Sequence, residues 1–507
     1  MIVFLPVAFA GDDLAAPPES RAAVIEPTRP EPGGLAFFAT FQARTGATDT
    51  ASTNPLLDGQ VIGDLGGTNG VVVDPTVVAA YTEQRANAFF TYRPKLLSGH
   101  AALTAAFEID FAFGDRAYGT GGNTGGGFGG DMVNLQTRRL HADFWATRGK
   151  HDIHALVGLQ FLGDGVSDPT AVAPDDLLRS GGRLMFFGSE AAGVAVYGRM
   201  HDAFGDRLRW RLGAFTLAEQ GNSRPDDTSL LVADAEFTPA YAVRVGAHAW
   251  YLQDRSGGTG GALGLGPTSA LSEMQGGPRL DPYDGYPPPE GAEILADLGW
   301  FGVDAAYNPR LDLADVGLTG AAFVNVGRLY APIVHDDRVL GALFDVEARW
   351  RYARGAGSVA RAEALVTTGG GVDPDRYGGV VTGNSYGVAG AFHATHGLLL
   401  LFPDARAINR LTPVLTDVSG RGRGVRALTA SVGYDLVPDR VTVAAAGGHA
   451  VAADGATWGT EIDARVAVVP LPLLEVAVYG GVLAPGAASG LAAAPWAVYG
   501  AINWLIP

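Results

Sequence analysis

The chain has 507 residues, with 53 acidic and 36 basic side chains and a formal net charge of −17. This balance argues against nucleic acid as a partner, because phosphate backbones are bound by clustered Lys and Arg. Cysteine is absent, so the fold must be stable without disulfides, and glycine, at 72 residues, is about twice as frequent as usual.

The N-terminal region divides into two segments before any periodic pattern begins. Residues 1–10 are apolar and end in Ala8-Phe9-Ala10, which is typical of the end of a secretory signal peptide with an A-x-A cleavage site. No basic segment precedes this run, and a mildly apolar tail is the alternative. Residues 11–33 contain five prolines without periodicity, so we predict a periplasmic tail there and a single barrel domain over residues 34–507.

From residue 35 onward, apolar and polar residues alternate in about twenty short stretches. In one of them, Leu103, Phe107 and Ile109 fall on one face, and Thr104 and Glu108 fall on the other. A period of two predicts β-strands, because successive side chains of a strand point to opposite sides of the sheet. The predicted strands are 35–44, 85–93, 101–113, 133–147, 153–161, 193–200, 208–218, 229–238, 241–253, 296–307, 315–328, 341–353, 358–368, 385–393, 398–402, 426–436, 441–452, 459–469, 473–483 and 496–506.

The connections between these stretches alternate in length. Short ones such as 148–152 and 470–472 are followed by long ones such as 254–295, 329–340 and 403–425. Short periplasmic turns and long extracellular loops are typical of an outer-membrane barrel. We therefore predict an all-β fold: a transmembrane antiparallel up-and-down β-barrel of about 18 strands, within a range of 16–20, that crosses the outer membrane many times.

The last predicted strand supports this interpretation. Trp496, Val498, Ile502 and Trp504 share one face of residues 496–506. The pattern resembles the C-terminal strand of bacterial outer-membrane proteins, which alternates and usually ends in an aromatic residue, although this chain ends in Ile506-Pro507. The resemblance implies that the partners include the barrel-assembly machinery and outer-membrane lipid.

Charged residues occupy the second face of many predicted strands. A charge directed at lipid near the membrane midplane costs roughly 2–4 kcal/mol, so these side chains are expected to face the lumen. Arginines concentrated on a few strands favour anions, and a salt-bridged wall without selectivity is the alternative. The predicted pore-lining residues are Arg209, Arg211, Arg244, Arg349, Arg351, Arg361, Arg465, Glu108, Asp110, Glu347, Glu363, Glu461 and Asp463.

One segment is similar to a known family. Val157-Gly158-Leu159-Gln160-Phe161, followed by Gly163-Asp164-Gly165, is similar to a strand and Gly-Asp loop of alginate-export-type barrels. That resemblance implies an 18-stranded barrel that exports an acidic polysaccharide through an Arg-lined lumen. Leu159 stands where the family segment has Arg, so only the architecture and the idea of a channel are carried over.

Motifs of other chemistry lack their required structural context. Residues 383–387 match G-x-S-x-G but precede a strand instead of a helix, and residues 125–130 match G-x-G-x-x-G without a βαβ unit. His151, His154, His393 and His396 are expected to be solvated turn residues, with metal ligation as the alternative. We predict no enzyme activity, no catalytic or metal site, and no cofactor beyond weak Ca²⁺ binding in acidic loops such as 281–284 and 373–375.

The sequence thus predicts a porin-like channel for diffusion or export of small polar or anionic solutes, with polysaccharide export as an extension. Two alternatives stay open: a receptor or adhesin that uses long extracellular loops on a barrel anchor, and a barrel hydrolase. The solute, the oligomeric state and the presence of an inward-folded loop are not readable from this pattern.

Overall fold

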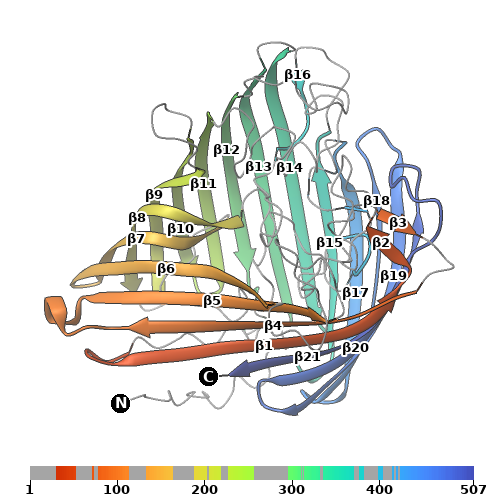
Figure 1. Ribbon diagram of the computed structural model, residues 1–507, viewed down its shortest axis with the longest axis horizontal. Helices are drawn as coiled ribbons and strands as arrows, with labels where there is room; N and C mark the ends of the chain where they lie inside the picture. Colours follow the sequence, from red (N-terminus) through yellow and green to blue (C-terminus); the bar gives the residue numbers. More distant parts are fainter. Residues whose placement is uncertain are drawn as a thin grey trace.

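We describe the fold from a computed structural model of the chain (Figure 1). The described residues are 30–52, 71–73, 78–113, 133–163, 188–202, 205–218, 227–255, 295–309, 311, 313–331, 335–369, 376–381, 398–402, 414–415, 418, 420 and 423–506. Within these ranges, no helix is both long and apolar enough to cross a membrane.

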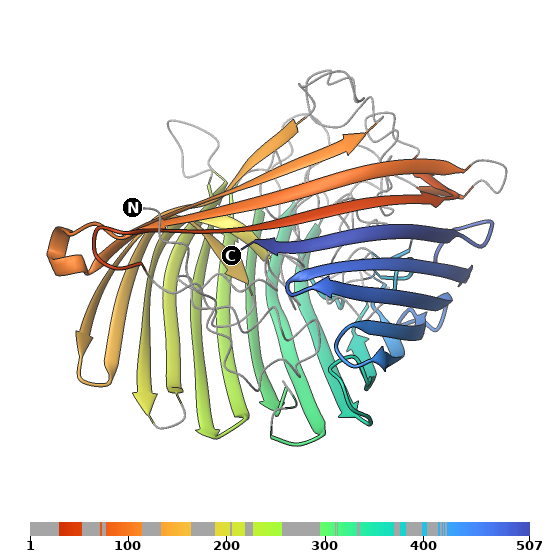
Figure 2. The same ribbon diagram turned by 90° about the horizontal axis from the view of Figure 1, so that it is seen from below.

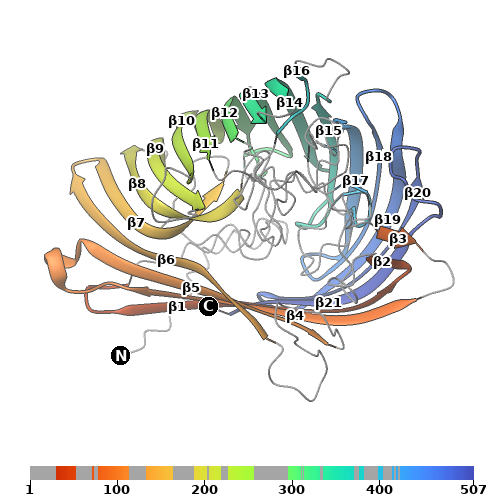
Figure 3. The ribbon, with the colours of Figure 1, turned by 45° about the horizontal axis from the view of Figure 1, so that its top comes forward.

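In the described part of the chain, eighteen antiparallel strands form a closed barrel, since β1 pairs with β4 on one side and with β21 on the other (Figure 3). The wall strands are 9–17 residues long. The wall strands are β1 (Leu35–Thr48), β4 (Ala79–Tyr92), β5 (Ala101–Phe113), β6 (Val133–Arg148), β7 (His151–Gly163), β8 (Gly188–Asp202), β9 (Gly205–Ala218), β10 (Thr228–Ala240), β11 (Val243–Asp254), β12 (Leu295–Tyr307), β13 (Val316–Ala331), β14 (His335–Arg351), β15 (Val359–Thr367), β17 (Arg426–Val437), β18 (Val441–Val451), β19 (Thr457–Leu471), β20 (Leu474–Pro485) and β21 (Trp496–Ile506).

Three short strands and one turn complete the described elements. β2 (Thr50–Ser52) and β3 (Val71–Val73) pair with each other, and η4 (Leu96–Gly99) is a short 3₁₀ turn between β4 and β5. β16 (Arg376–Tyr377) pairs in parallel with β14, next to Arg338 and Val339. It therefore continues the sheet beyond the end of β15, which pairs with β14 only from Leu343 onward.

The two ends of the barrel differ in the length of the connections between strands. The two-residue turn from β6 to β7 lies at the same end as the start of β1 and the end of β21 (Figures 1 and 2). The 40-residue connection from β11 to β12 and the connection from β15 to β17 lie at the other end. By the rule for outer-membrane barrels, the short-turn end is periplasmic and the long-loop end is extracellular.

The predicted fold class is confirmed, with two corrections. The predicted long loop 329–340 is wrong, because β13 and β14 continue as a ladder to the pair Ala331–His335. The predicted strand 398–402 is also wrong, because its backbone bonds to a side chain of the wall instead of a neighbouring strand. The predicted strand 385–393 lies outside the described residues.

The outer face of the wall is a continuous apolar surface. On β20, the exposed Val476, Val478 and Val482 alternate with the buried Ala477 and Leu483. Exposed aromatic residues lie near strand ends on this face, where the interfacial level of a membrane would be. These are Tyr92, Tyr241, Tyr251, Tyr307, Trp350 and Trp504.

The outer face gives a direct stability prediction. Val478 lies near the middle of β20 and faces outward between Val466 and Gly500 of the neighbouring strands. Val478→Arg should lower the free energy of unfolding by about 2–4 kcal/mol in phospholipid vesicles, because the new charge would face hydrocarbon. Urea titration followed by tryptophan fluorescence measures the difference.

Val478→Leu is the matched control, and it should stay within about 0.5 kcal/mol of the parent, as most apolar swaps at open positions do. An arginine variant as stable as the leucine variant would show that this face does not contact lipid.

Candidate functional site

The inner face of the barrel carries the charged side chains of the alternating strands. On β19, the buried Glu461 and Asp463 alternate with the exposed Ile462 and Val466. On β14, the buried Asp345 and Glu347 alternate in the same way with apolar residues that face outward. Because a carboxylate on the lipid side would be costly, the charged face is the one that encloses the lumen.

The structure places the predicted pore-lining side chains that it describes on this inner face. Whether they line a conducting pore stays a prediction. Asp110 lies in β5, where the backbone pairs with Arg85 and Asn134, but its side chain lies outside the described residues. The other twelve are Arg209, Arg211, Arg244, Arg349, Arg351, Arg361, Arg465, Glu108, Glu347, Glu363, Glu461 and Asp463.

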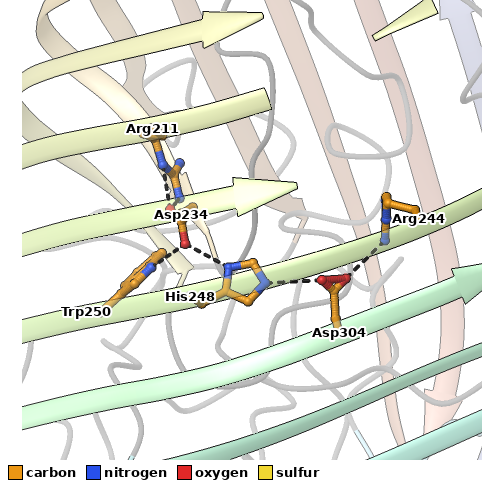
Figure 4. Close-up of polar contacts among 6 residues, drawn as sticks. All are labelled: Arg211, Asp234, Arg244, His248, Trp250 and Asp304. Atoms are coloured by element: carbon orange, nitrogen blue, oxygen red, sulfur yellow. Dashed lines mark hydrogen bonds and ion pairs between the residues drawn. The ribbon is translucent and has the colours of Figure 1, made fainter. Parts of the chain in front are cut away.

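The centre of the largest described charge network is Asp234 of β10 (Figure 4). Arg211 of β9 donates to its Oδ2 from Nε at 2.9 Å and from Nη2 at 2.6 Å. Trp250 of β11 donates from its indole N–H to Oδ1 at 2.7 Å. Both Arg211 and His248 stand directly opposite Asp234 in the strand register, so two cross-strand pairs share one buried carboxylate.

His248 links this centre to a second carboxylate. Its Nδ1 lies 2.8 Å from Asp234 and its Nε2 lies 3.2 Å from Asp304 of β12. Carboxylates only accept hydrogen bonds, so the imidazolium form of the ring, which donates from both nitrogens, satisfies both contacts. Gly246 lies opposite Asp304 in the register, and a Cβ at that position would contact the Asp304 carboxylate. The glycine therefore leaves room for the His248–Asp304 contact.

The network then continues toward the periplasmic end. Arg244 of β11 lies 3.5 Å from Asp304 and 3.4 Å from Glu236 of β10. Arg209 of β9 lies 4.0 Å from the same Glu236. Eight side chains from four neighbouring strands thus form one continuous patch of alternating charge. They are Arg209, Arg211, Asp234, Glu236, Arg244, His248, Trp250 and Asp304.

A second charged patch lies on β14 and β15, where like charges face each other across the strands. Arg349 is opposite Arg361, and Glu347 is opposite Glu363. Arg349 pairs along its own strand with Glu347 and also bonds to the carbonyl of Pro309. The second predicted lumen arginine of β14, Arg351, donates to the carbonyl of Leu311 at 3.0 Å, so it holds the periplasmic turn between β12 and β13.

A third patch combines arginines with tyrosines. Arg465 of β19 pairs with Glu475 of β20 at 2.6 Å and lies over the ring of Tyr479. Tyr479 packs against Tyr499 of β21 with ring centroids 5.0 Å apart, and the Arg44 guanidinium lies 3.4 Å from the centroid of Tyr499. Arginine stacks well on aromatic faces, so both cations are held flat against the wall.

Water reaches the arginines of these patches more than their acidic partners. The Arg244 side chain is 47% exposed against 21% for Asp304, Arg209 is 31% exposed against 12% for Glu236, and Arg349 is 22% exposed against 1% for Glu347. The carboxylates lie against the wall and the guanidinium groups cover them. The accessible part of the inner charge in these three pairs is therefore positive.

Part of the connection between β15 and β17 packs against the inner wall. Its residues 398–402, together with Val380, Val381, Val414 and Val418, are buried in one cluster with inner-face side chains of the wall. Trp300 of β12 donates its indole N–H to the carbonyl of Val381 at 2.8 Å. The segment therefore occupies space inside the barrel toward the extracellular end.

Glu461 holds this inward segment instead of pairing with an arginine. Its Oε1 accepts the backbone N–H of Leu399 at 2.7 Å and of Leu400 at 2.8 Å, and its Oε2 accepts that of Leu401 at 2.5 Å. Glu461 is fully buried, so the segment covers it from the lumen. At the outer end of the segment, Arg423 pairs with Asp454 of the loop after β18, and hydrogen bonds from Arg423 and from a backbone N–H hold the pKa of Asp454 below its usual range.

The structure corrects the prediction of solvated turn histidines at one position. His154 is fully buried on the inner face of β7, because the alternation of the strand directs its side chain away from the outer surface. Its Nδ1 lies 3.0 Å from Asp143, and its ring stacks between Trp145 and Tyr197 at centroid distances of 5.9 and 4.4 Å. Within the described residues, no group of three or more His, Asp or Glu side chains is arranged to hold a metal ion. The acidic loops 281–284 and 373–375 lie outside them.

Sequence reasoning missed several partners of the predicted arginines. Asp234, Glu236 and Asp304 pair with arginines of neighbouring strands, and Glu475 pairs with Arg465. Each stands between two apolar residues of its strand, so the same argument from a charge between apolar neighbours could have placed it on the inner face. The pairing itself depends on the register between strands, which one strand's pattern does not contain.

No protein-family model matches the chain, and no curated protein matches it in sequence. Solved outer-membrane porins match in structure. OccK8 (OprE) of Pseudomonas aeruginosa is 9% identical, with 93% of this chain and 98% of that chain covered and a TM-score of 0.46. OpdK of Pseudomonas aeruginosa with vanillate is 10% identical, with 92% and 98% covered and a TM-score of 0.45. OccAB1 of Acinetobacter baumannii is 11% identical, with 93% and 97% covered and a TM-score of 0.46.

At these identities and scores, the comparisons carry no argument about solute or mechanism. They lend no support to the alginate-export resemblance, to polysaccharide export or to the receptor alternative. The closed barrel, its apolar outer surface and its charged inner wall define a transmembrane β-barrel of the outer-membrane type.

The Asp234 network predicts a large stability effect. Asp234→Ala leaves Arg211 and His248 buried beside each other without the carboxylate that both contact. Removing one partner of a buried ion pair costs about 3–5 kcal/mol, so urea unfolding should show a loss of that size. Asp315→Ala, at an exposed periplasmic turn position, is the control and should change the free energy of unfolding by about 0.5 kcal/mol or less. Equal stability of the two variants would contradict the role of Asp234 as the centre of the network.

The Glu461 contacts predict an effect on the inward segment. Glu461→Ala removes the acceptor of three backbone N–H groups, and a hydrogen bond to a charged group contributes about 1.5–3 kcal/mol. Chymotrypsin cleavage within residues 398–402 should therefore become at least about ten times faster, because cleavage follows the population of the opened segment.

The control for this experiment is Glu475→Ala, which removes an inner-face carboxylate that pairs with Arg465 and Asn503 near the periplasmic turn between β19 and β20. Equal cleavage rates in Glu461→Ala and the parent would show that the carboxylate does not hold the segment in place.

Proposed function

We propose that this protein is an outer-membrane channel that admits small polar solutes and prefers anions. The single observation that carries the proposal is the unequal exposure of the inner-face ion pairs. Arg209, Arg244 and Arg349 are each more exposed than the carboxylates beneath them. A passing solute meets guanidinium groups first, and these bind carboxylate and phosphate oxygens in a fixed geometry.

The width of the barrel supports passage of solutes. An 18-stranded wall encloses more space than its own side chains fill, as in other barrels of 16–18 strands. The segment that includes residues 398–402 takes up part of this space near the extracellular end. The charged patches of β9–β12 and of β14–β15 extend from there toward the periplasmic turns. We infer a path along these patches, with the remaining predicted residues Arg361, Arg465 and Asp463 near it.

Vanillate, with which the OpdK structure was solved, is a small aromatic carboxylate. We propose to test solutes of this class on the present channel. The choice rests on the exposed arginines of this chain, because a guanidinium group binds the carboxylate that this class of solute carries.

Planar-bilayer recording tests the proposal. The parent should show stepwise conductance and a reversal potential that favours chloride in a KCl gradient. In Arg209→Gln/Arg244→Gln, the chloride preference should fall at least roughly fivefold, because even one charge about 4 Å from a passing ion changes its energy by about 1 kcal/mol in water. Arg426→Gln on the outer face of β17 is the control and should leave the reversal potential unchanged. The absence of stepwise conductance would contradict the proposed channel function. A preference for cations in the parent would contradict the proposed role of the arginines in anion selection.

A further inference from the structure

Both lysines of the chain lie on neighbouring periplasmic turns. The sequence has 36 basic side chains of Lys and Arg, and Lys95 and Lys150 are the only lysines among them. Lys95 precedes η4 in the turn from β4 to β5, and Lys150 lies in the turn from β6 to β7 (Figures 1 and 3). The backbone N–H of Trp145 on β6 donates to the carbonyl of His100 at 3.1 Å, so the two turns lie side by side. The chain therefore places both of its ammonium side chains on one sector of the periplasmic end.

Two further basic residues belong to this sector. Arg148 and His151 are directly opposite each other in the β6–β7 register, and both are exposed. They are an even number of residues from the outward-facing Phe144 and Ile153, so they stand on the outer side of the wall. We call the four exposed side chains the basic rim: Lys95, Arg148, Lys150 and His151.

The described acidic residues of the adjoining strands have other partners. Asp152, which follows His151, lies 3.0 Å from His201 and 3.8 Å from Arg199. Asp202, at the end of β8, lies 2.8 Å from Arg207. Within the part of the chain that the structure describes, neither carboxylate forms an ion pair with the basic rim. The rim therefore presents its cations toward the surroundings of the barrel.

The turn beside the rim carries two leucines on a strained backbone. Leu96 and Leu97 of η4 are 72% and 63% exposed. Leu97 and Ser98 have φ angles of 52° and 54°, and this left-handed backbone costs an L residue roughly 1–2 kcal/mol. Arg93 stabilises the turn, because its Nε donates to the carbonyl of Gly99 at 2.7 Å. The turn is thus held in a shape that keeps both leucines at the surface.

These leucines continue the apolar outer surface beyond the strand ends. Tyr92 is opposite Leu103 in the β4–β5 register, and both side chains are exposed on the outer face. η4 begins at Leu96, four residues after Tyr92. Aromatic residues at strand ends mark the interfacial level of a membrane. Lysine and arginine side chains at that level keep their stems on apolar surface and extend their charged ends to the headgroups.

We propose that the basic rim binds the phosphate group of an anionic phospholipid in the inner leaflet, and that Leu96 and Leu97 contact the acyl chains of the same lipid. Ammonium and guanidinium groups donate several hydrogen bonds to phosphate oxygens. An apolar surface bordered by cations fits a molecule that has both a phosphate and acyl chains. The site is on the outside of the barrel, so it is independent of solute passage through the lumen.

Native mass spectrometry of the full-length protein in a mild detergent tests the proposal, with dioleoyl phosphatidylglycerol as the probe. The parent should retain this lipid more strongly than dioleoyl phosphatidylcholine, which has the same chains and no net charge. Lys95→Gln/Lys150→Gln should lower the retention of phosphatidylglycerol at least about tenfold, because each lysine near an anionic headgroup contributes to binding. The matched control is Arg354→Gln/Arg440→Gln, which removes two exposed cations from the β14–β15 and β17–β18 turns and should bind like the parent.

Acetylation of the two lysines gives a second measurement that does not depend on removing them. In phosphatidylglycerol vesicles, a membrane-permeant amine-directed ester should modify Lys95 and Lys150 at least about three times more slowly than in phosphatidylcholine vesicles, because an ammonium group bound to phosphate is not a nucleophile. Arg440→Lys adds a lysine on a distant periplasmic turn and reports the effect of membrane charge alone. Peptide mass spectrometry compares the three sites in one sample, and equal slowing at all three would contradict a specific site.

Three results of the binding experiment would overturn the proposal. The first is equal retention of phosphatidylglycerol by the parent and the lysine variant. The second is an equal loss in the lysine and arginine variants, because net charge instead of this site would then control binding. The third is equal stabilisation of the parent by glycerol phosphate at the same concentration, because the rim would then bind a free anion without acyl chains.

Discussion

The structure depends on closure of the sheet between the first and the last wall strands. Inside a membrane no water pairs with backbone N–H and C=O groups, so every strand edge must have a neighbour. β1 and β21 meet over ten register pairs, from Ala39–Ile506 to Thr48–Ala497, and remove the two edges that the chain would otherwise present to lipid. On the outer side of this seam, Phe41 is opposite Trp504, so the closing pair also continues the apolar surface.

Closure fixes which side of each strand meets lipid, and this in turn decides where the charge can go. Charged residues on the inner face stand at neighbouring positions of adjacent strands, and most of them pair there. In the Arg209–Glu236, Arg244–Asp304 and Arg349–Glu347 pairs, the acidic member is the more buried one. The long arginine side chain reaches over the shorter carboxylate toward water. An overall negative chain therefore presents positive groups along this part of its interior.

Period-two alternation predicted the wall well because it is the direct consequence of strand geometry. The predicted bounds of β5 and β21 agree with the structure at both ends. The prediction failed where apolar residues occur without alternation. The apolar run at residues 398–402 predicts a strand. In the structure, Glu461 of β19 accepts backbone N–H groups of this run and keeps the segment irregular. A single sequence does not show that a wall carboxylate and a loop sixty residues earlier meet.

The charge networks were partly predictable for a related reason. Alternation separates inner from outer residues, but the partner of each charge depends on the register between strands. Asp234 meets Arg211 and His248 because all three occupy one register row. His154 is only the fourth residue after the turn, yet the alternation places it on the inner side, where Asp143 and two aromatic rings surround it. The face of the strand therefore predicts the burial of His154 better than its distance from the turn does.

The same register logic distinguishes two kinds of arginine in this barrel. On the inner face, Arg211 stands opposite the carboxylate of Asp234, whereas Arg349 stands opposite Arg361 and pairs with Glu347 of its own strand. Outside, Arg328 and Arg338 stand opposite each other at the edge of the apolar surface. Both sets lie on a boundary between apolar surface and water, so composition and exposure alone do not separate them. The facing residue on the next strand is the additional information, and it depends on the register between the strands.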